Sequence, residues 1–144
     1  MSPVKVLIVD DEVPFVQTLM KRLTRRGLQL EAAYNGPEAL EKLSKDKDID
    51  VVILDVKMPE MDGIEVLREI KKLHPLTQVI MLTGHSTVES AIEGMQLGAY
   101  DYLLKPCDIE RVLATVAAAA AKKAGHEEKM LEAQIKDIVR KQGY

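Results

Sequence analysis

Five short aliphatic runs, separated by longer amphipathic stretches, constrain the fold of this chain more than any other feature of its sequence. A run such as Val51-Val52-Ile53-Leu54 is continuously apolar, which is typical of a strand covered on both faces of a sheet. Alternation of such strands with helices indicates βαβ units with right-handed crossovers, and hence a parallel α/β sheet with helices on both faces. We expect strands within residues 4–9, 28–34, 51–54, 78–82 and 100–104.

The stretches between these runs carry helix signals. Phe15, Leu19 and Leu23 recur at helical spacing, and Gly27 ends their pattern, which predicts a helix over residues 14–26. Thr87, with Ser86 before it, is suited to cap the start of another helix. Further helices are therefore expected at residues 37–43, 64–73 and 88–97.

The C-terminal residues have a different composition. Residues 114–124 are rich in alanine and favour a helix, which Gly125 is predicted to interrupt. In residues 126–142, apolar side chains return at helical spacing with charged residues opposite. This segment is either a last helix packed on its own domain or a helix for a dimer or partner. The second interpretation is favoured because five strands already complete a domain, which we place at residues 1–124, with a helical C-terminal extension at 125–144.

Composition excludes several classes of function. The 144 residues suit one domain, and a net charge of −3 without a basic stripe argues against nucleic acid as the main partner. No signal peptide is visible, and no apolar run approaches the roughly 20 residues of a membrane span. A single cysteine allows no disulfide within the chain, so we expect a reducing, cytoplasmic location.

Polar residues follow four of the five predicted strands. Asp10 and Asp11 follow the first, Asp55 the third, Thr83 the fourth and Lys105 the fifth. The carboxyl ends of parallel strands share one edge of the sheet, where open α/β folds bind ligands. The five side chains should therefore converge there, while the second strand, which adds nothing obvious, fits an outer position.

The chemistry of this set points to a metal and a phosphoryl group. Three carboxylates cannot all stay ionised beside one lysine without help, which calls for a hard divalent cation such as Mg²⁺. An aspartate beside a metal and Lys105 can act as a nucleophile and form an aspartyl phosphate. The metal and Lys105 would neutralise charge on the phosphoryl oxygens, and Thr83 could donate a hydrogen bond to one of them.

These residues lie in the motifs VLIVDDE, VVILDVKMPEMDG, VIMLTGHS and GAYDYLLKP, which occur in this order. Through them, residues 4–123 resemble the receiver domain of bacterial two-component response regulators, most closely the receivers of the nitrogen-regulatory activator class. The resemblance implies a doubly wound, flavodoxin-like α/β fold with a five-stranded parallel sheet in the order 2-1-3-4-5. It also implies a phosphorelay protein that is not an enzyme in the usual sense and promotes only its own phosphorylation and dephosphorylation.

The resemblance also implies a role for each motif residue. Asp55 would be the phosphoacceptor, Asp11 a direct Mg²⁺ ligand and Asp10 a ligand through water. The backbone carbonyl of Lys57 would complete the protein ligands of the metal, to which Asp55 also contributes.

Further implied roles concern the response to phosphorylation. Lys105 would pair with the phosphoryl group, through a segment in which the Lys105–Pro106 peptide bond is cis. Thr83 would move toward the phosphoryl group while Tyr102 turns inward behind it, and Gly63 would serve the loop after the acceptor strand.

Two positions that vary in this family, Lys57 and His85, would set the lifetime of the phosphoryl group. We hypothesise that Lys57 lies over the phosphoryl group and hinders attacking water. The alternative is that Lys57 is only a solvated loop lysine.

The implied partners are a sensor histidine kinase or phosphotransfer protein, and a second copy of the chain. That copy would bind through the surface of the fourth helix, fifth strand and fifth helix, or through the tail helix. No ATPase or DNA-binding sequence follows, so we expect neither direct nucleic acid binding nor membrane contact in this chain.

Two other functions compete with this reading. The first is a phosphate-independent protein-binding module, against which the complete set of acids, threonine and lysine argues. The second is a Mg²⁺-dependent phosphatase with an aspartate nucleophile. Such enzymes place two acids one residue apart after the first strand, whereas Asp10 and Asp11 are adjacent.

Overall fold

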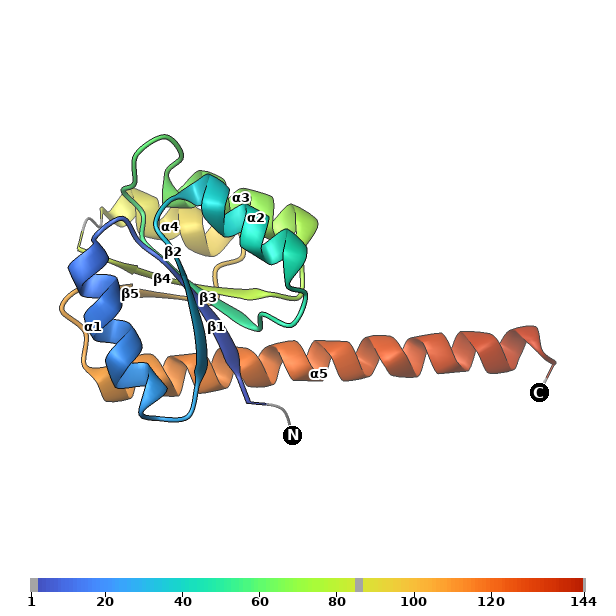
Figure 1. Cartoon of the computed structure of the whole chain (residues 1–144). Coiled ribbons are helices and arrows are strands. Elements are labelled where there is room, and N and C mark those ends of the chain that lie inside the picture. The colour runs from blue at the N-terminus through green and yellow to red at the C-terminus, as the bar shows by residue number, and fades with distance from the viewer. Residues whose placement is uncertain (1–2, 85–86, 144) are drawn as a thin grey trace.

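The sheet has five parallel strands in the order β2-β1-β3-β4-β5, as the resemblance implies (Figure 1). The computed structural model describes residues 3–84 and 87–143. Within these residues, strands and helices alternate strictly along the chain. The elements are β1 (Lys5–Val9), α1 (Val13–Thr24), β2 (Gln29–Ala33), α2 (Gly36–Lys45), β3 (Val51–Leu54), α3 (Gly63–Leu73), β4 (Gln78–Thr83), α4 (Val88–Gln96), β5 (Asp101–Leu104) and α5 (Ile109–Lys141).

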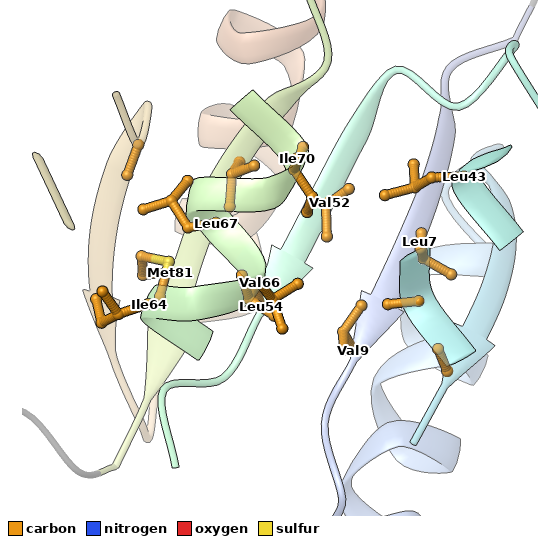
Figure 2. Close-up of a cluster of buried hydrophobic side chains, with 14 of the residues drawn as sticks. Leu7, Val9, Leu43, Val52, Leu54, Ile64, Val66, Leu67, Ile70 and Met81 are labelled. Carbon is orange, nitrogen blue, oxygen red and sulfur yellow. The ribbon is translucent and has the colours of Figure 1, made fainter. Parts of the chain in front are cut away.

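Helices cover both faces of the sheet, with α2, α3 and α4 on one face and α1 and α5 on the other (Figure 1). Alternate residues of each strand point to opposite faces, so Leu7 and Val9 belong to one buried cluster and Ile8 to the other. Leu67 of α3 packs into the first cluster (Figure 2), and Val116 of α5 packs into the second. Each such buried side chain contributes about 1.5–3 kcal/mol, which explains why the central strands are apolar throughout.

Hydrogen bonds extend the sheet one residue beyond its strands at the edge where the candidate site lies. The backbone amide of Asp10 donates to the carbonyl of Ala33 over 3.1 Å, and that of Asp55 donates to the carbonyl of Val9 over 3.0 Å. The backbones of both aspartates are therefore fixed by the sheet itself.

Side-chain caps start several helices at or near the expected residues. Asn35 accepts a hydrogen bond from the amide of Glu38 over 2.8 Å, which begins α2. Thr87 caps α4 as predicted, and Ser90 completes a reciprocal capping box with it. The observed helix bounds differ from the predicted ones by one or two residues at most ends.

The prediction that Gly125 interrupts the last helix is wrong, because α5 is a single helix of 33 residues. A glycine inside a helix costs about 1 kcal/mol relative to alanine, and the alanine-rich residues before it outweigh that cost. An ion pair of 3.4 Å between Lys123 and Glu127 also spans the glycine. In the described part of the chain, no helix is both long enough and apolar enough to cross a membrane.

The second half of α5 leaves the domain. Val112, Val116, Ala119 and Lys123 are buried, whereas the described residues from Glu127 onward are exposed. The C-terminal half of α5 therefore extends away from the rest of the protein (Figure 1). Packing of the whole helix on its own domain, one of the two alternatives left open by the sequence, does not occur here.

Candidate functional site

Three carboxylates meet at the carboxyl edge of the sheet. Asp10 and Asp55 are each only 2% exposed, and Asp11 beside them is exposed to solvent. One oxygen from each of the three side chains can be chosen so that all lie within 4.8 Å of one another. An all-oxygen set of this size, open on one side through Asp11, fits a hard divalent cation that keeps several waters.

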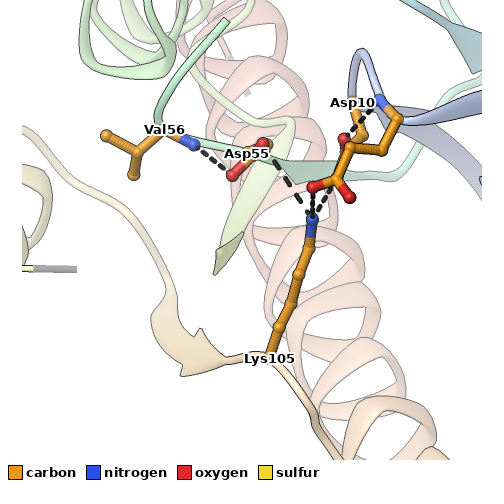
Figure 3. Close-up of polar contacts among 5 residues, drawn as sticks. Asp10, Asp55, Val56 and Lys105 are labelled. Atoms are coloured by element: carbon orange, nitrogen blue, oxygen red, sulfur yellow. Dashed lines mark hydrogen bonds and ion pairs between the residues drawn. The ribbon is translucent and has the colours of Figure 1, made fainter. Parts of the chain in front are cut away.

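Backbone amides orient the two buried carboxylates (Figure 3). The amide of Val56 donates to Oδ1 of Asp55 over 2.9 Å, and the amide of Glu12 donates to Oδ1 of Asp10 over the same distance. Each acid thus uses its Oδ1 for a fixed backbone contact, while the Oδ2 of each faces Lys105, at 2.7 Å from Asp10 and 4.0 Å from Asp55.

Lys105 brings the only positive charge that contacts these two acids among the described residues (Figure 3). Its Nζ lies 2.7 Å from Oδ2 of Asp10 and 4.0 Å from Oδ2 of Asp55. The same nitrogen lies 3.2 Å from Glu12 and 4.1 Å from the centre of the Phe15 ring. The peptide bond that follows, Lys105–Pro106, is cis.

Burial and the neighbouring charges both shift the pKa values at this edge of the sheet. Burial raises the pKa of Asp10, although Lys105 and the amide of Glu12 favour its ionised form. Burial alone would lower the pKa of Lys105, but the contact with Asp10 and the charge of Asp55 outweigh it and raise the pKa. One ammonium therefore serves several acids, which leaves room for a further cation.

Thr83 is fully buried at the end of β4. Its carbonyl accepts a hydrogen bond of 2.9 Å from the amide of Lys105, which ties the ends of β4 and β5 together. The threonine and the lysine therefore occupy neighbouring positions at the edge that carries the acids.

An open depression of about 450 Å³ lies beside Asp55. Gly63 allows the loop that forms it to close, because a Cβ at this position would lie 2.0 Å from the carbonyl oxygen of Asp55. Lys57 is exposed at the depression, and its side chain forms no hydrogen bond or ion pair with any of the described residues. The depression is lined by Asp11, Glu12, Asp55, Lys57, Met58, Pro59 and Asp62.

Tyr102 lies apart from the acids and contacts α4 instead. It is half-buried against the core, and its hydroxyl lies 3.0 Å from the Oγ of Ser90. Sequence reasoning missed Ser90, although its spacing of three residues from the capping Thr87 was a usable signal. His85, predicted to affect phosphoryl lifetime, lies outside the described residues.

Comparison with known proteins identifies the motif set. A sequence profile described as the response regulator receiver domain matches residues 6–117. The transcriptional regulatory protein ZraR of Klebsiella oxytoca is 41% identical over 118 residues, which are 82% of this chain and 26% of that protein. The DNA-binding transcriptional regulator NtrC of Escherichia coli strain K12 is also 41% identical, over 77% of this chain and 24% of its own length.

Solved structures agree with the sequence matches. A response regulator receiver domain protein from Clostridium thermocellum has a TM-score of 0.81 and 37% identity, covering 84% of this chain and 97% of its own. The CheX-CheY-BeF3-Mg complex from Borrelia burgdorferi contains a chain with a TM-score of 0.76 and 35% identity, covering 81% of this chain and 88% of its own. The chain thus spans about a quarter of the length of the curated relatives it matches, and nearly all of the solved receiver domain.

Proposed function

Because this chain belongs to the receiver domain family of two-component response regulators, we propose that Asp55 accepts a phosphoryl group in a Mg²⁺-dependent reaction. The observation that carries this proposal is the position of the Asp55 carboxylate. It is buried, oriented by the Val56 amide, and adjacent to Asp10, Asp11, Lys105 and an open depression.

In the proposed reaction, a carboxylate oxygen of Asp55 attacks the phosphorus of a phosphohistidine on the donor protein. The new O–P bond forms as the P–N bond breaks, and the imidazole leaves with the electron pair and takes up a proton. Lys105 would balance charge on the transferred group, and its distance of 4.0 Å from Asp55 supports this role. Thr83, at the end of the neighbouring strand, would donate a hydrogen bond from its hydroxyl to a phosphoryl oxygen.

Asp10, Asp11, Asp55 and the backbone carbonyl of Lys57 would hold the Mg²⁺ ion. The all-oxygen donor set and the spacing of its three carboxylates support this assignment. When bound, the ion supplies positive charge that offsets the crowding of acids and of phosphoryl oxygens.

The central test is labelling by a small phosphodonor, such as phosphoramidate, with Mg²⁺ and intact-protein mass spectrometry. We expect the native chain to gain one phosphoryl group and Asp55→Asn to gain none. Asp62→Asn is the matched control, because Asp62 lines the same depression but is not one of the three clustered aspartates. Labelling of Asp55→Asn at the native rate would overturn the assignment.

Phosphorylation is proposed to shift a two-state equilibrium through Thr83 and Tyr102, at a typical coupling of about 1–3 kcal/mol. The contact of Tyr102 with Ser90 supports this, because it joins β5 to the first turn of α4. Titration with beryllofluoride and Mg²⁺ should shift amide resonances in α4 and β5 as well as around Asp55. Shifts confined to the pocket would contradict the switch.

Lys57 and His85 are proposed to set the lifetime of the phosphoryl group. The exposed position of Lys57 on the depression supports shielding of the group from water. Lys57→Ala keeps the backbone carbonyl and should hydrolyse its aspartyl phosphate severalfold faster, measured as loss of the phosphorylated mass with time. Unchanged decay would leave Lys57 as a solvated loop lysine.

The proposed partners are a sensor histidine kinase or phosphotransfer protein and a second copy of this chain. The copy would bind through the α4–β5–α5 surface or through the α5 tail. Exposed apolar side chains on both surfaces support this, including Ile92 on α4 and Ile135 on the tail. We further propose a cytoplasmic location and a regulatory role in which the only reactions promoted are phosphorylation and dephosphorylation of Asp55.

A further inference from the structure

An apolar row lies on the part of α5 that leaves the domain. Leu131, Ile135, Ile138 and Val139 are between 42% and 56% exposed, which is unusual for four large aliphatic side chains on one helix face. Their spacing of four, three and one residues keeps them together along about two turns of helix.

This row does not continue the face of α5 that packs on the sheet. The packing face carries Val116 and Lys123, and seven residues after Lys123 it reaches Met130. Met130 lines a groove of about 280 Å³ with Leu43 and Leu76 at the base of the domain. Leu131 and the residues in line with it are rotated from that face by about 100° around the helix axis. The domain therefore does not pack against Leu131, Ile135, Ile138 and Val139, which we call the Leu131 row.

Charge is divided along the same segment. Its first half is mainly acidic and its second half mainly basic, and one residue of the opposite sign occurs in each half. The acidic half has Glu127, Glu128 and Glu132 with Lys129, and the basic half has Lys136, Arg140 and Lys141 with Asp137.

We propose that two copies of this chain pair through the Leu131 row with their α5 tails antiparallel. This inference rests on the homodimer proposed above and specifies its surface and orientation. Antiparallel pairing places the acidic half of each tail against the basic half of the other, whereas parallel pairing places like charges together.

The residues beside the row give the same orientation. Glu127, Gln134 and Lys141 are seven residues apart and flank the row on one side. In an antiparallel pair, this side of one tail faces the same side of the other tail, running in the opposite direction. Glu127 then lies beside the partner's Lys141, and the dimer contains this contact twice. In a parallel pair, Glu127 would instead face Glu132 of the partner subunit twice, with two repulsive contacts.

The groove at the base of the domain adds a second contact to this arrangement. Glu127, where the free part of α5 begins, lines the groove together with Asp46 and Met130. An antiparallel partner would bring its basic tip, at Lys141, to this end of the tail. The surface is then self-complementary about a two-fold axis, as a closed dimer requires.

Charge reversal in the full, unphosphorylated chain distinguishes the two orientations by sedimentation equilibrium. We expect Glu127→Lys and Lys141→Glu each to weaken dimerisation roughly tenfold, because two attractive contacts become repulsive. The double variant should recover most of the affinity. Lys129→Glu, which makes the same charge change as Lys141→Glu on the opposite face, should change it little. Circular dichroism of each variant checks helicity, since both positions also form ion pairs within α5.

Tighter dimerisation of Glu127→Lys would overturn the antiparallel orientation in favour of a parallel one. A disulfide test gives an independent answer in a Cys107→Ser background. Gln134→Cys should form a disulfide-linked dimer only in an antiparallel pair, where residue 134 of one copy lies beside residue 134 of the other. Leu131→Cys should form one only in a parallel pair. A chain that remains monomeric at millimolar concentration overturns both the orientation and the homodimer. Neither result affects phosphorylation of Asp55, which is measured separately.

Discussion

Lys105 holds two buried acids with one ammonium group, and that shortage of positive charge governs the site. Its Nζ contacts Asp10 at 2.7 Å and stands at 4.0 Å from Asp55. A divalent cation bound by the same acids would be repelled by the ammonium, by roughly 2 kcal/mol at about 4 Å in water-like surroundings, which is twice the value for two unit charges. We therefore expect the lysine to stabilise the metal-free site and to lower the affinity of that site for a metal ion.

Replacement of this lysine tests that balance. We expect Lys105→Met to bind Mg²⁺ severalfold more tightly than the native chain, in isothermal titration calorimetry, because the competing charge is gone. Lys72→Met, on the exposed side of α3, is the control for a lost positive charge elsewhere. Weaker binding by Lys105→Met would mean that the lysine organises the carboxylates rather than competing with the ion.

Gly63 and Gly125 differ in the space around them, so a methyl group should have opposite effects at the two positions. Gly63→Ala would place a Cβ 2.0 Å from the carbonyl oxygen of Asp55, so we expect a loss of about 3 kcal/mol or more in free energy of unfolding. Gly125→Ala meets nothing within 4 Å inside a helix and should gain about 1 kcal/mol of helix stability. Urea unfolding measures the first and thermal circular dichroism of α5 the second. Equal stability of native protein and Gly63→Ala would contradict the close approach.

Sequence reasoning could place the backbone of the site but not all of its contacts. Asp10, Asp55, Thr83 and Lys105 were located because parallel strands end at a common edge, and that rule needs only the strand positions. The spacing of Ser90 from Thr87 signals a role in the cap of α4, but the contact of Ser90 with Tyr102 depends on the packing of α4 against β5, which no local pattern specifies.

At the scale of elements, α4 is the least embedded helix of the domain. Of its described residues only Gly94 is buried, while Val88 and Ile92 are largely exposed. Its first turn is held by Thr87, Ser90 and, through Ser90, by Tyr102. A helix with so few buried contacts can shift at low cost in free energy, which suits the proposed response of α4 to Tyr102.

Paired variants separate the cap of α4 from its link to β5. Ser90→Ala removes both, and Tyr102→Phe removes only the link, so we expect faster amide exchange over the first turn of α4 in both. The increase should be larger in Ser90→Ala, by about 1 kcal/mol in opening free energy, because the capping box is also lost. Hydrogen–deuterium exchange measures this. Protection in Tyr102→Phe identical to that of the native chain would show that the hydroxyl contact does not restrain α4.

Helix existence was predictable from periodicity, whereas the continuity of α5 was not. Glycine is a frequent helix end, and Gly27, which lies just beyond the end of α1, has a positive φ of 87°. Gly125 instead follows an alanine-rich stretch and continues α5. The difference is that the chain after Gly27 must turn into β2, while no such constraint acts after Gly125.

At the scale of the whole molecule, Lys123 anchors α5 to the edge of the sheet opposite the acids. Its side chain is 8% exposed and lies 3.0 Å from Asp50, just before β3, and 3.4 Å from Glu127. Burial alone would lower the pKa of Lys123, but Asp50 and Glu127 outweigh it and raise the pKa above 10.5. The stabilisation is therefore complete below pH 10.5 and lost as the pH rises through the higher folded-state pKa.

We expect Lys123→Gln to lose about 2 kcal/mol of unfolding free energy at neutral pH, because two charged contacts disappear. The difference from the native chain should shrink as the pH rises above 10.5, since the native lysine then loses its proton. Urea unfolding across this range checks both statements, and Lys129→Gln on the free tail controls for loss of charge. A difference that does not vary with pH would assign the effect to packing alone.

The unbroken course of α5 has a mechanical consequence. A helix rising 1.5 Å per residue places the tip, 18 residues beyond Lys123, about 27 Å from its last anchor. The helix begins at the edge of the sheet that carries the acids and has its last buried residue at Lys123, so a tilt of its packed half would move its tip. A tilt of about 5° at the body would carry the tip sideways by about 2 Å, enough to change the reach of anything joined to it. A small rearrangement beside Asp55 would thus become a larger displacement at the tip of α5.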